Sequence, residues 1–135
     1  MLTRFASLAA CALLTGCATA PAGEPFPTSS ADDAMRCSAI MTARAIQMGP
    51  ADVQRARADR KPEQLFCMSE AWTDEAWRRG GPAGPDHETV VERVDAMIRP
   101  LAFGGQLVVD EAVNVCAAKV PARDPRFVRI PAKNC

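Results

Sequence analysis

The chain has 135 residues, the length of one small domain, and its 16 basic and 16 acidic side chains cancel. A net charge of zero without a basic stripe argues against a nucleic-acid partner. Tyrosine is absent, and phenylalanine and tryptophan are few. The remaining apolar residues, chiefly alanine, valine and methionine, favour helices over a β-sandwich, so we expect an all-α domain.

Residues 1–16 have the layout of an export signal, in which Arg4 precedes a short, mostly apolar run. That run is too short to span a bilayer, which takes about 20 apolar residues. It ends in Leu14-Thr15-Gly16-Cys17, where a cysteine directly follows a small residue. This tetrapeptide resembles the lipobox of bacterial lipoproteins. The resemblance covers the signal and Cys17 only, and we recognise no family in the mature domain.

The resemblance implies that the chain is cut before Cys17 and that this cysteine carries acyl chains, usually palmitate among them. Two or three acyl chains give stable membrane anchoring. Because Ala18 rather than an acidic residue follows the cysteine, we expect the outer membrane, with the protein facing the periplasm. The alternative is an ordinary signal peptide cut after Ala20. Pro21 would then follow the cut directly, which hinders signal peptidase.

Residues 17–31 contain three prolines and small residues without periodicity, so they predict a lipidated tether. Residues 32–135 then form the helical domain. Cys11 leaves with the signal and Cys17 is lipidated. Four cysteines remain, which in an oxidising compartment predict two disulfides: Cys37, Cys67, Cys116 and Cys135.

Four cysteines allow three pairings, of which we expect Cys37–Cys67 and Cys116–Cys135. The first pair requires the first and third helices to run in the same direction, with a short helix between them returning the chain. The second pair requires the tail to fold back onto the last helix. A structural zinc site is disfavoured, because its ligands are usually closely paired in sequence and these cysteines are not.

Three helices are predicted in the first half of the domain. The first spans 32–48, with Ser30 as N-cap and Gly49-Pro50 as the stop signal. Pro50 can begin a short second helix that extends to about residue 60. Pro62 suits the first turn of a third helix, which ends near Arg79 ahead of a Gly- and Pro-rich loop over 80–85.

The second half of the domain begins with Asp86, a good N-cap for a fourth helix with an apolar stripe of valine, methionine and isoleucine. Pro100 and Gly104-Gly105 separate this helix from a fifth, predicted over 106–119. Residues 120–135 carry three prolines and predict an irregular tail held by Cys135. The expected fold is therefore a bundle of four to five short helices with two disulfides.

His87 is the only histidine, and Asp86 and Glu88 flank it. Residues adjacent on a helix do not face one another, and a cap with a first-turn acid explains both carboxylates. We therefore expect His87 to project into solvent and assign no catalytic residue. A metal carrier that binds through Met35, Met41 or Met48 is an alternative function. However, Met41 and Met48 lie on the same core-facing stripe as Cys37, and Met35 lies outside that stripe.

Trp72 lies on the apolar stripe of the third helix, whereas Trp77 is five residues further along and faces elsewhere. Trp77, Arg78 and Arg79 therefore form a candidate binding patch. A second basic cluster, Arg55-Ala56-Arg57 with Arg60-Lys61, is interrupted by acids and is expected to be a solvated face.

We therefore expect an envelope lipoprotein that is not an enzyme and needs no metal or cofactor. Its role would be structural or in protein interaction, with an envelope protein or the cell wall as partner. The alternatives are a small periplasmic enzyme using His87 and the metal carrier. An enzyme would require a second titratable group beside His87 in a cleft.

Overall fold

The computed structural model describes residues 30–127, and its regular elements there are all helical. The α-helices are α1 (Ala31–Gln47), α2 (Pro50–Arg55), α3 (Pro62–Gly80), α4 (His87–Phe103) and α5 (Asp110–Ala117), with 3-10 helices η1 (Ala58–Arg60) and η2 (Pro125–Phe127). The expected all-α fold is confirmed for these residues. None of these helices is long and apolar enough to cross a membrane. Cys17 and Cys135 lie outside the described range.

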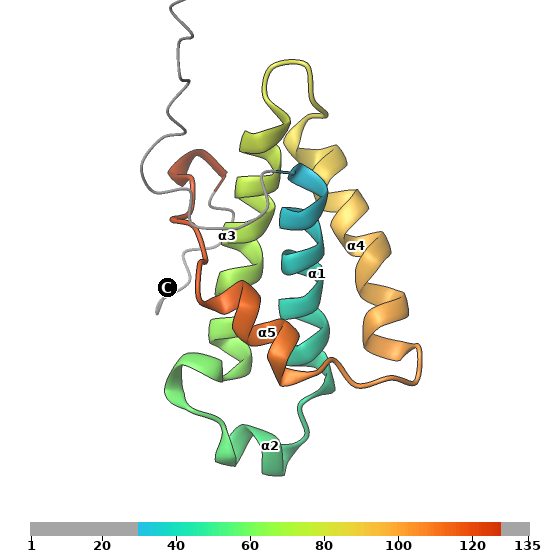
Figure 1. The fold of residues 1–135 in the computed structure, drawn as a ribbon, viewed down its shortest axis with the longest axis vertical. Coiled ribbons are helices and arrows are strands. Elements are labelled where there is room, and N and C mark those ends of the chain that lie inside the picture. Colours follow the sequence, from blue (N-terminus) through green and yellow to red (C-terminus); the bar gives the residue numbers. More distant parts are fainter. Residues whose placement is uncertain (1–29, 128–135) are drawn as a thin grey trace, which may run out of the picture.

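Helix α1 lies between α3 and α4, and α5 crosses it on one side (Figure 1). Helices α1 and α3 are antiparallel. Their order of contact shows this, because Ser38 Oγ lies 2.7 Å from Thr73 Oγ1 while Thr42 Oγ1, one turn later, lies 2.7 Å from Ser69 Oγ. Short α2 does not return the chain but forms part of the connection at one end of the bundle (Figure 1).

Local signals at the helix ends act as predicted. Ser30 Oγ accepts a hydrogen bond from the backbone nitrogen of Asp33 at 3.0 Å, and Asp86 Oδ1 accepts one from Thr89 at 2.7 Å. Both caps satisfy amide groups that a helix start leaves without partners. The second helix is shorter than predicted, because the chain is extended at Ala56 before it forms η1.

Of the residues predicted to separate α4 from α5, Gly104 caps the end of α4, whereas Pro100 does not interrupt the helix. The helix continues to Phe103, and Pro100 lies inside its last turn. Pro100 lacks a backbone donor of its own, but its carbonyl accepts a hydrogen bond from the backbone nitrogen of Gly104 at 3.0 Å, so the last turn is completed. Helix α5 is shorter than the predicted 106–119. The segment before it is held by Gln47, whose Oε1 accepts from the Val108 nitrogen at 2.8 Å.

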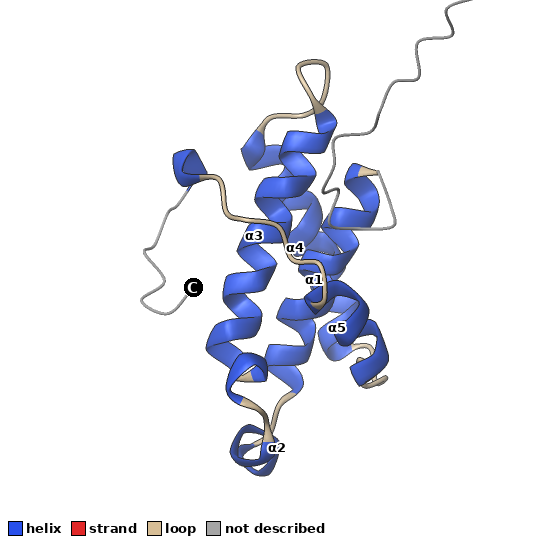
Figure 2. Cartoon of the chain, turned by 60° about the vertical axis from the view of Figure 1, so that its left-hand side comes forward, coloured by secondary structure: helices blue, strands red, loops and turns tan. Residues whose placement is uncertain are grey.

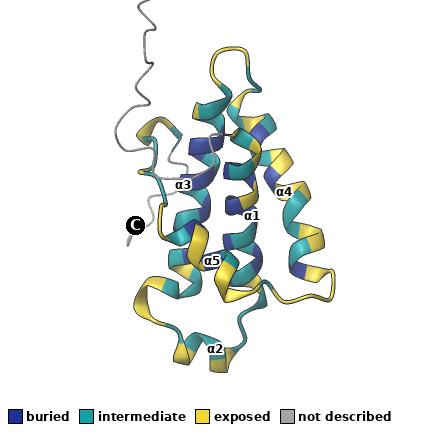
Figure 3. Cartoon of the chain, in the orientation of Figure 1, coloured by how far each residue is buried: buried dark blue, intermediate teal, exposed yellow. Residues whose placement is uncertain are grey.

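Burial in α1 is not confined to one stripe, because three helices pack around it (Figure 3). Met41 is buried as predicted, but Met35, which the periodicity places outside the stripe, is also buried. Small side chains occupy much of the remaining surface of α1 and allow its neighbours to approach closely. They are Ala34, Ser38, Ala39, Ala43 and Ala45, all buried.

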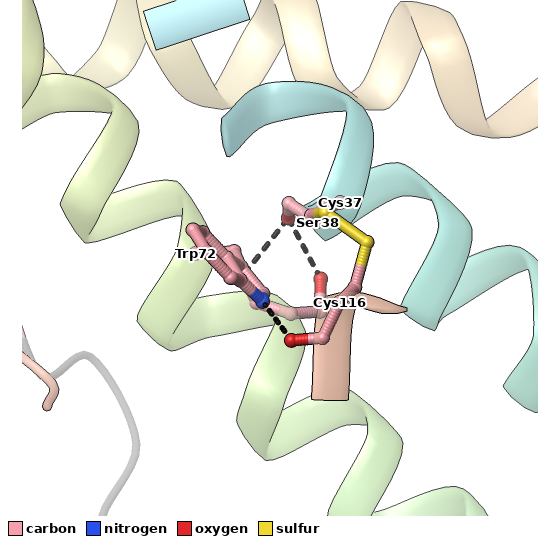
Figure 4. Close-up of a disulfide and its surroundings, with 5 residues drawn as sticks. Cys37, Ser38, Trp72 and Cys116 are labelled. Carbon is pink, nitrogen blue, oxygen red and sulfur yellow. Dashed lines mark hydrogen bonds between the residues drawn. A yellow bond between two sulfur atoms is a disulfide. The ribbon is translucent and has the colours of Figure 1, made fainter. Parts of the chain in front are cut away.

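Trp72 and a disulfide form the centre of the core (Figure 4). Trp72 is fully buried, and its indole Nε1 donates to the carbonyl oxygen of Cys116 at 3.3 Å. Beside it, Cys37 of α1 is bonded to Cys116 of α5, with their Cα atoms 5.5 Å apart. This bond holds α5 across α1 at the level of Trp72.

Both predicted disulfide pairings are therefore wrong, because Cys37 and Cys116 bond each other rather than Cys67 and Cys135. The error lies in the direction of α3. With α1 and α3 antiparallel, the residues of α3 at the level of Ser38 are Ser69 and Thr73, so Cys67 lies further along the bundle. The position of Cys135 falls outside the described residues.

After α5 the chain runs as a loop across α3 and reaches η2 on its far side (Figure 2). Two contacts hold this segment to α3. Arg123 Nη2 lies 2.6 Å from Glu70 Oε2, and the rings of Phe127 and Trp77 have centroids 4.3 Å apart in an edge-on arrangement. The described part of the tail is thus irregular, as predicted, but packed on the helices.

Glu75 is a buried carboxylate on α3 that two arginines neutralise. Arg78 Nε and Arg79 Nε each donate to it at 2.7 Å. Burial alone would raise the pKa of Glu75, but the hydrogen bonds from the two guanidinium groups outweigh burial and hold the pKa below its ordinary value of 4.5. The Arg79 guanidinium also lies over the Trp72 ring, 5.9 Å from its centroid.

Replacing Trp72 by alanine is expected to lower the free energy of unfolding by roughly 3–5 kcal/mol, because a fully buried aromatic side chain leaves a cavity. Urea denaturation monitored by circular dichroism measures the change. The matched control is Phe103→Ala, since Phe103 is 72% exposed and its loss should cost about 0.5 kcal/mol or less. Similar losses in the two variants would contradict a core role for Trp72.

Glu75→Gln is expected to reduce the acid sensitivity of the fold. A carboxyl whose pKa is lower in the folded state contributes its full stability above about pH 4.5 and loses it as the pH falls through the folded value. The wild type should therefore lose stability more steeply than the variant as the pH falls below about 4.5. Urea titrations at several pH values measure the slopes, and exposed Glu92→Gln should keep the wild-type slope.

Candidate functional site

His87, the first residue of α4, faces a buried carboxylate on α3. Its Nε2 lies 3.0 Å from Asp74 Oδ1, and the exposed fractions of the two side chains are 11% and 6%. The loop over 80–85 joins α3 and α4 closely enough for the last turns of one to meet the first turn of the other. The ionised carboxylate can only accept, so His87 Nε2 is the donor in that state.

The prediction that His87 projects into solvent is therefore wrong. The ring of Phe127 stacks on the His87 ring with centroids 4.2 Å apart and planes within 5°, and Trp77 approaches its edge. Phe127 reaches this position from η2, forty residues later in the chain. Asp86 acts as the cap that the sequence predicted, and Glu88 is exposed. The periodicity of the helix alone could not indicate that a distant ring covers this turn.

Asp74 has one satisfied oxygen and one unsatisfied oxygen. Oδ1 is hydrogen-bonded to His87, whereas Oδ2 is buried and has no hydrogen-bond partner among the described residues. A buried polar group without a partner carries a desolvation cost of about 1–3 kcal/mol, and more when it is charged. Such a group in a native structure needs an explanation, and a donor from outside residues 30–127, such as water or a ligand, provides one.

Asp74 and His87 line a pocket of about 230 Å³ between α3, α4 and the tail. We call it the His87 pocket and define it by its lining residues. They are Thr42, Ser69, Glu70, Thr73, Asp74, His87, Val91, Val94, Asp95, Ile98, Arg123 and Phe127. Val91, Val94 and Ile98 make much of the α4 side apolar, whereas the α3 side is polar, and such a mixture is expected of a small-molecule site.

Arg123 closes the pocket on the side of the tail. Its Nη2 lies 2.6 Å from Glu70 Oε2, and its side chain is 14% exposed. Its Nε is buried without a hydrogen-bond partner among residues 30–127. Three buried polar atoms of pocket-lining residues therefore lack a hydrogen bond within residues 30–127. Two are acceptors, Asp74 Oδ2 and Glu70 Oε2, of which the second is ion-paired with Arg123, and one is a donor, Arg123 Nε.

Hydroxyl groups connect the polar side of the pocket to the core. Ser38 Oγ, which is fully buried, lies 2.9 Å from Ser69 Oγ and 2.7 Å from Thr73 Oγ1. Thr42 Oγ1 extends this series of hydroxyl contacts and lies 2.7 Å from Ser69 Oγ. These short contacts set the spacing of α1 and α3, and so they position the α3 residues that line the pocket.

The predicted patch of Trp77, Arg78 and Arg79 is divided by the structure. Trp77 is half-buried beneath Arg126, whose guanidinium carbon lies 5.1 Å from the Trp77 ring centroid. The Arg79 side chain is only 3% exposed and faces Glu75, whereas the Arg78 side chain extends to the surface. The three side chains therefore do not form one exposed surface.

The tail residue Arg126 is held over Trp77 by an ion pair with Asp124. Hydrogen bonds from the Arg126 side chain and backbone lower the pKa of Asp124 to about 2. The pair is therefore charged throughout the physiological range, and it keeps η2, with Phe127, against the end of α3.

The methionines contribute to packing. Met35 and Met41 are buried and Met48 is partly buried in the core cluster. Cys37 has no thiolate to offer a metal, because its sulfur is bonded to Cys116. Among residues 30–127 no group of three or more histidine, cysteine, aspartate or glutamate side chains has the geometry of a metal site.

A larger pocket of about 370 Å³ lies between the ends of α1 and α5 and the α2–η1 connection. Four arginines line it, but each already faces a carboxylate. Arg44 lies 3.3 Å from Asp110 and Arg55 3.2 Å from Asp52. Arg57 and Arg60 both pair with Asp59. The arginines of the basic cluster are therefore paired with the acidic residues that interrupt it in the sequence. This pairing leaves the His87 pocket as the stronger candidate site.

Sequence reasoning missed Asp74, Glu70, Arg123 and Phe127. Only Asp74 had a usable signal. The short loop over 80–85 makes α3 and α4 antiparallel neighbours, so a residue two turns before the loop can meet the first turn after it. Arg123 and Phe127 lie in a proline-rich tail without periodicity, where no local pattern indicates a docking position.

His87→Ala is expected to lower the free energy of unfolding by roughly 1–3 kcal/mol. The change removes the stacking partner of Phe127 and leaves the Asp74 carboxylate without its hydrogen bond. Urea denaturation at pH 7 measures it, with exposed Glu92→Ala on the same helix as control, expected within about 0.5 kcal/mol. If His87→Ala were as harmless as the control, His87 would be a solvent-exposed residue in solution.

No family model, curated protein or solved structure matches this chain. Its function therefore has to follow from the chemistry of the His87 pocket rather than from its fold, because small helical folds serve many unrelated functions.

Proposed function

We propose that this chain is an envelope lipoprotein whose helical domain binds a small ligand in the His87 pocket without transforming it. The observation that carries the binding role is Asp74 Oδ2, a buried acceptor on the wall of a pocket that has no hydrogen-bond partner among the described residues. This role is non-catalytic, as expected from the sequence, but it replaces the expected structural or protein-interaction role by the binding of a small molecule. The ligand would come from the periplasm or the cell wall, which the anchored domain faces.

Export is supported by two independent features. The tetrapeptide Leu14-Thr15-Gly16-Cys17 resembles a lipobox. The buried bond between Cys37 and Cys116 is typical of proteins that fold in oxidising compartments, since cytosolic thiols are kept reduced. An outer-membrane anchor at Cys17, followed by a proline-containing tether, would hold the domain at the periplasmic surface.

The non-catalytic role is supported by the surroundings of His87. A general base needs a ring nitrogen directed at a substrate or a nucleophile. Within residues 30–127, no hydroxyl or thiol group forms a hydrogen bond with His87, and Phe127 covers one face of its ring. His87 thus positions the Asp74 carboxylate through a hydrogen bond and the Phe127 ring through stacking.

One observation favours a second candidate, a small periplasmic enzyme. His87 has a titratable neighbour, Asp74, inside a pocket, and a carboxylate that orients a histidine is a recurring arrangement in catalytic sites. The two candidates differ in what His87→Gln would do. In an enzyme, His87→Gln would abolish turnover and preserve the affinity for the ligand. In a binding protein, it would change the affinity for the ligand, and there would be no turnover to lose.

The mature protein extracted from membranes is expected to begin at Cys17 and to carry acyl chains. Intact-mass spectrometry should show loss of residues 1–16 and the added acyl mass, because the lipobox directs both modifications. The Cys17→Ala variant is the control, since it should remain uncleaved at this site and unacylated. A mature chain that begins at Pro21, or an unmodified Cys17 thiol, would contradict the anchor.

The same preparation, digested without reduction, also tests the second disulfide. Cys67 takes part in a disulfide, and its partner is outside residues 30–127. If Cys11 is removed and Cys17 acylated, Cys135 is the only partner left. Linked peptides should therefore contain Cys37 with Cys116, and Cys67 with Cys135. A Cys17–Cys67 peptide would contradict both the pairing and the anchor.

A further inference from the structure

The charges that line the His87 pocket are unbalanced. Within residues 30–127 three carboxyl groups line it, those of Glu70, Asp74 and Asp95, whereas Arg123 is the only guanidinium. Arg123 is already engaged with Glu70 at 2.6 Å. No cation within residues 30–127 forms an ion pair with Asp95, which is exposed at the rim. The pocket thus presents a surplus of negative charge to whatever enters it.

The position of this charge is specific. Asp74 is 94% buried, judged from the 6% exposure of its side chain, and its Oδ2 accepts no hydrogen bond from residues 30–127. An ionised carboxylate oxygen only accepts hydrogen bonds, so its natural partner is a donor. Hydrogen bonds in which both groups are charged are the strongest of this kind, which favours a cationic donor over a neutral one.

The opposite wall selects for an apolar group. Val91, Val94 and Ile98 of α4 line it, together with the ring of Phe127. At about 230 Å³ the pocket is below the range usual for drug-sized ligands, so it suits a molecule of fragment size. A phosphate close to the cationic group would be repelled by Glu70 and Asp95, which disfavours a phosphoethanolamine headgroup.

We propose that the His87 pocket binds a small organic cation, with its ammonium group donating to Asp74 Oδ2 and its apolar chain lying on Val91, Ile98 and Phe127. This proposal rests on the binding role proposed above and names the chemical class of the ligand. In this arrangement His87 holds the Asp74 carboxylate in place from its other oxygen, and the ion pair of Arg123 with Glu70 closes the pocket.

The test uses the oxidised, full-length mature chain and four probes that share a size range. They are n-hexylammonium, n-hexanol, hexanoate and O-phosphoethanolamine. Titration followed by ¹H–¹⁵N NMR gives both the affinity and the residues affected. Hexylammonium should shift the amide signals of the pocket residues and bind at least about tenfold more tightly than hexanol, as expected for a charge-assisted hydrogen bond. Hexanoate and O-phosphoethanolamine should leave these signals unchanged.

Two variants locate the contact. Asp74→Asn should weaken hexylammonium binding by roughly tenfold or more while preserving the shape of the site. Glu92→Gln removes one exposed charge from the same region of α4 without touching the pocket and should bind as the wild type does. If Asp74→Asn does not fold, the ranking of the four probes on the wild type still decides the question.

The outcomes separate the two proposals. Pocket signals that respond equally to hexanol or hexanoate would overturn the cationic ligand and leave the binding role intact. Equal affinity of hexylammonium for wild type and Asp74→Asn would do the same. If none of the probes shifts a pocket residue, the cationic ligand and the proposed binding role both fail.

Discussion

The bond between Cys37 and Cys116 is the constraint on which the rest of the structure depends. It fixes the last helix across the first at the level of Trp72, whose indole donates to the Cys116 carbonyl. The chain that leaves α5 therefore starts from a fixed point beside α3. From there a few extended residues suffice to bring Arg123 to Glu70 and Phe127 to His87. The disulfide does not line the pocket, but it directs the tail onto α3. The tail residues Arg123 and Phe127 then form one side of the pocket.

The same constraint compensates for the composition of the core. Helix α1 is lined largely with alanine and serine, which allow close helix packing but bury little apolar area. A domain of this size has a modest core, and cross-links are a common supplement. A bond closing 79 residues contributes roughly 4 kcal/mol in the chain-entropy estimate, which is comparable to the burial of a large aromatic side chain.

The parts of the fold that the sequence predicted correctly are those with local causes. Ser30, Asp86 and the Gly49-Pro50 pair act within one turn of their own positions, and they mark helix ends whatever the rest of the chain does. The disulfide pairing has no local cause, because it depends on whether α3 runs with or against α1. The length of the connection between them left that direction open, and the wrong choice gave Cys37 and Cys116 the wrong partners.

The candidate site shows the same division more sharply. The sequence predicted an exposed His87, which is wrong, whereas its neighbours Asp86 and Glu88 were assigned correctly to the helix start. Its environment, however, is made by Asp74 across a loop and by Phe127 from the far end of the chain. Neither contact can be read from the local sequence, because the partners are distant along the chain. An amphipathic pattern therefore cannot show whether another segment covers a helix start that it predicts to be exposed.

Two buried carboxylates on α3, one residue apart, illustrate how a structural charge differs from a functional one. Glu75 receives hydrogen bonds from two arginines, so its burial is compensated within the helix that carries it. Asp74 receives one hydrogen bond from His87 and keeps one oxygen unsatisfied in a pocket. A small domain has little stability to spare, and an uncompensated buried charge lowers it further. An unsatisfied carboxylate oxygen beside a fully neutralised carboxylate therefore supports the proposal that Asp74 binds a donor from outside residues 30–127.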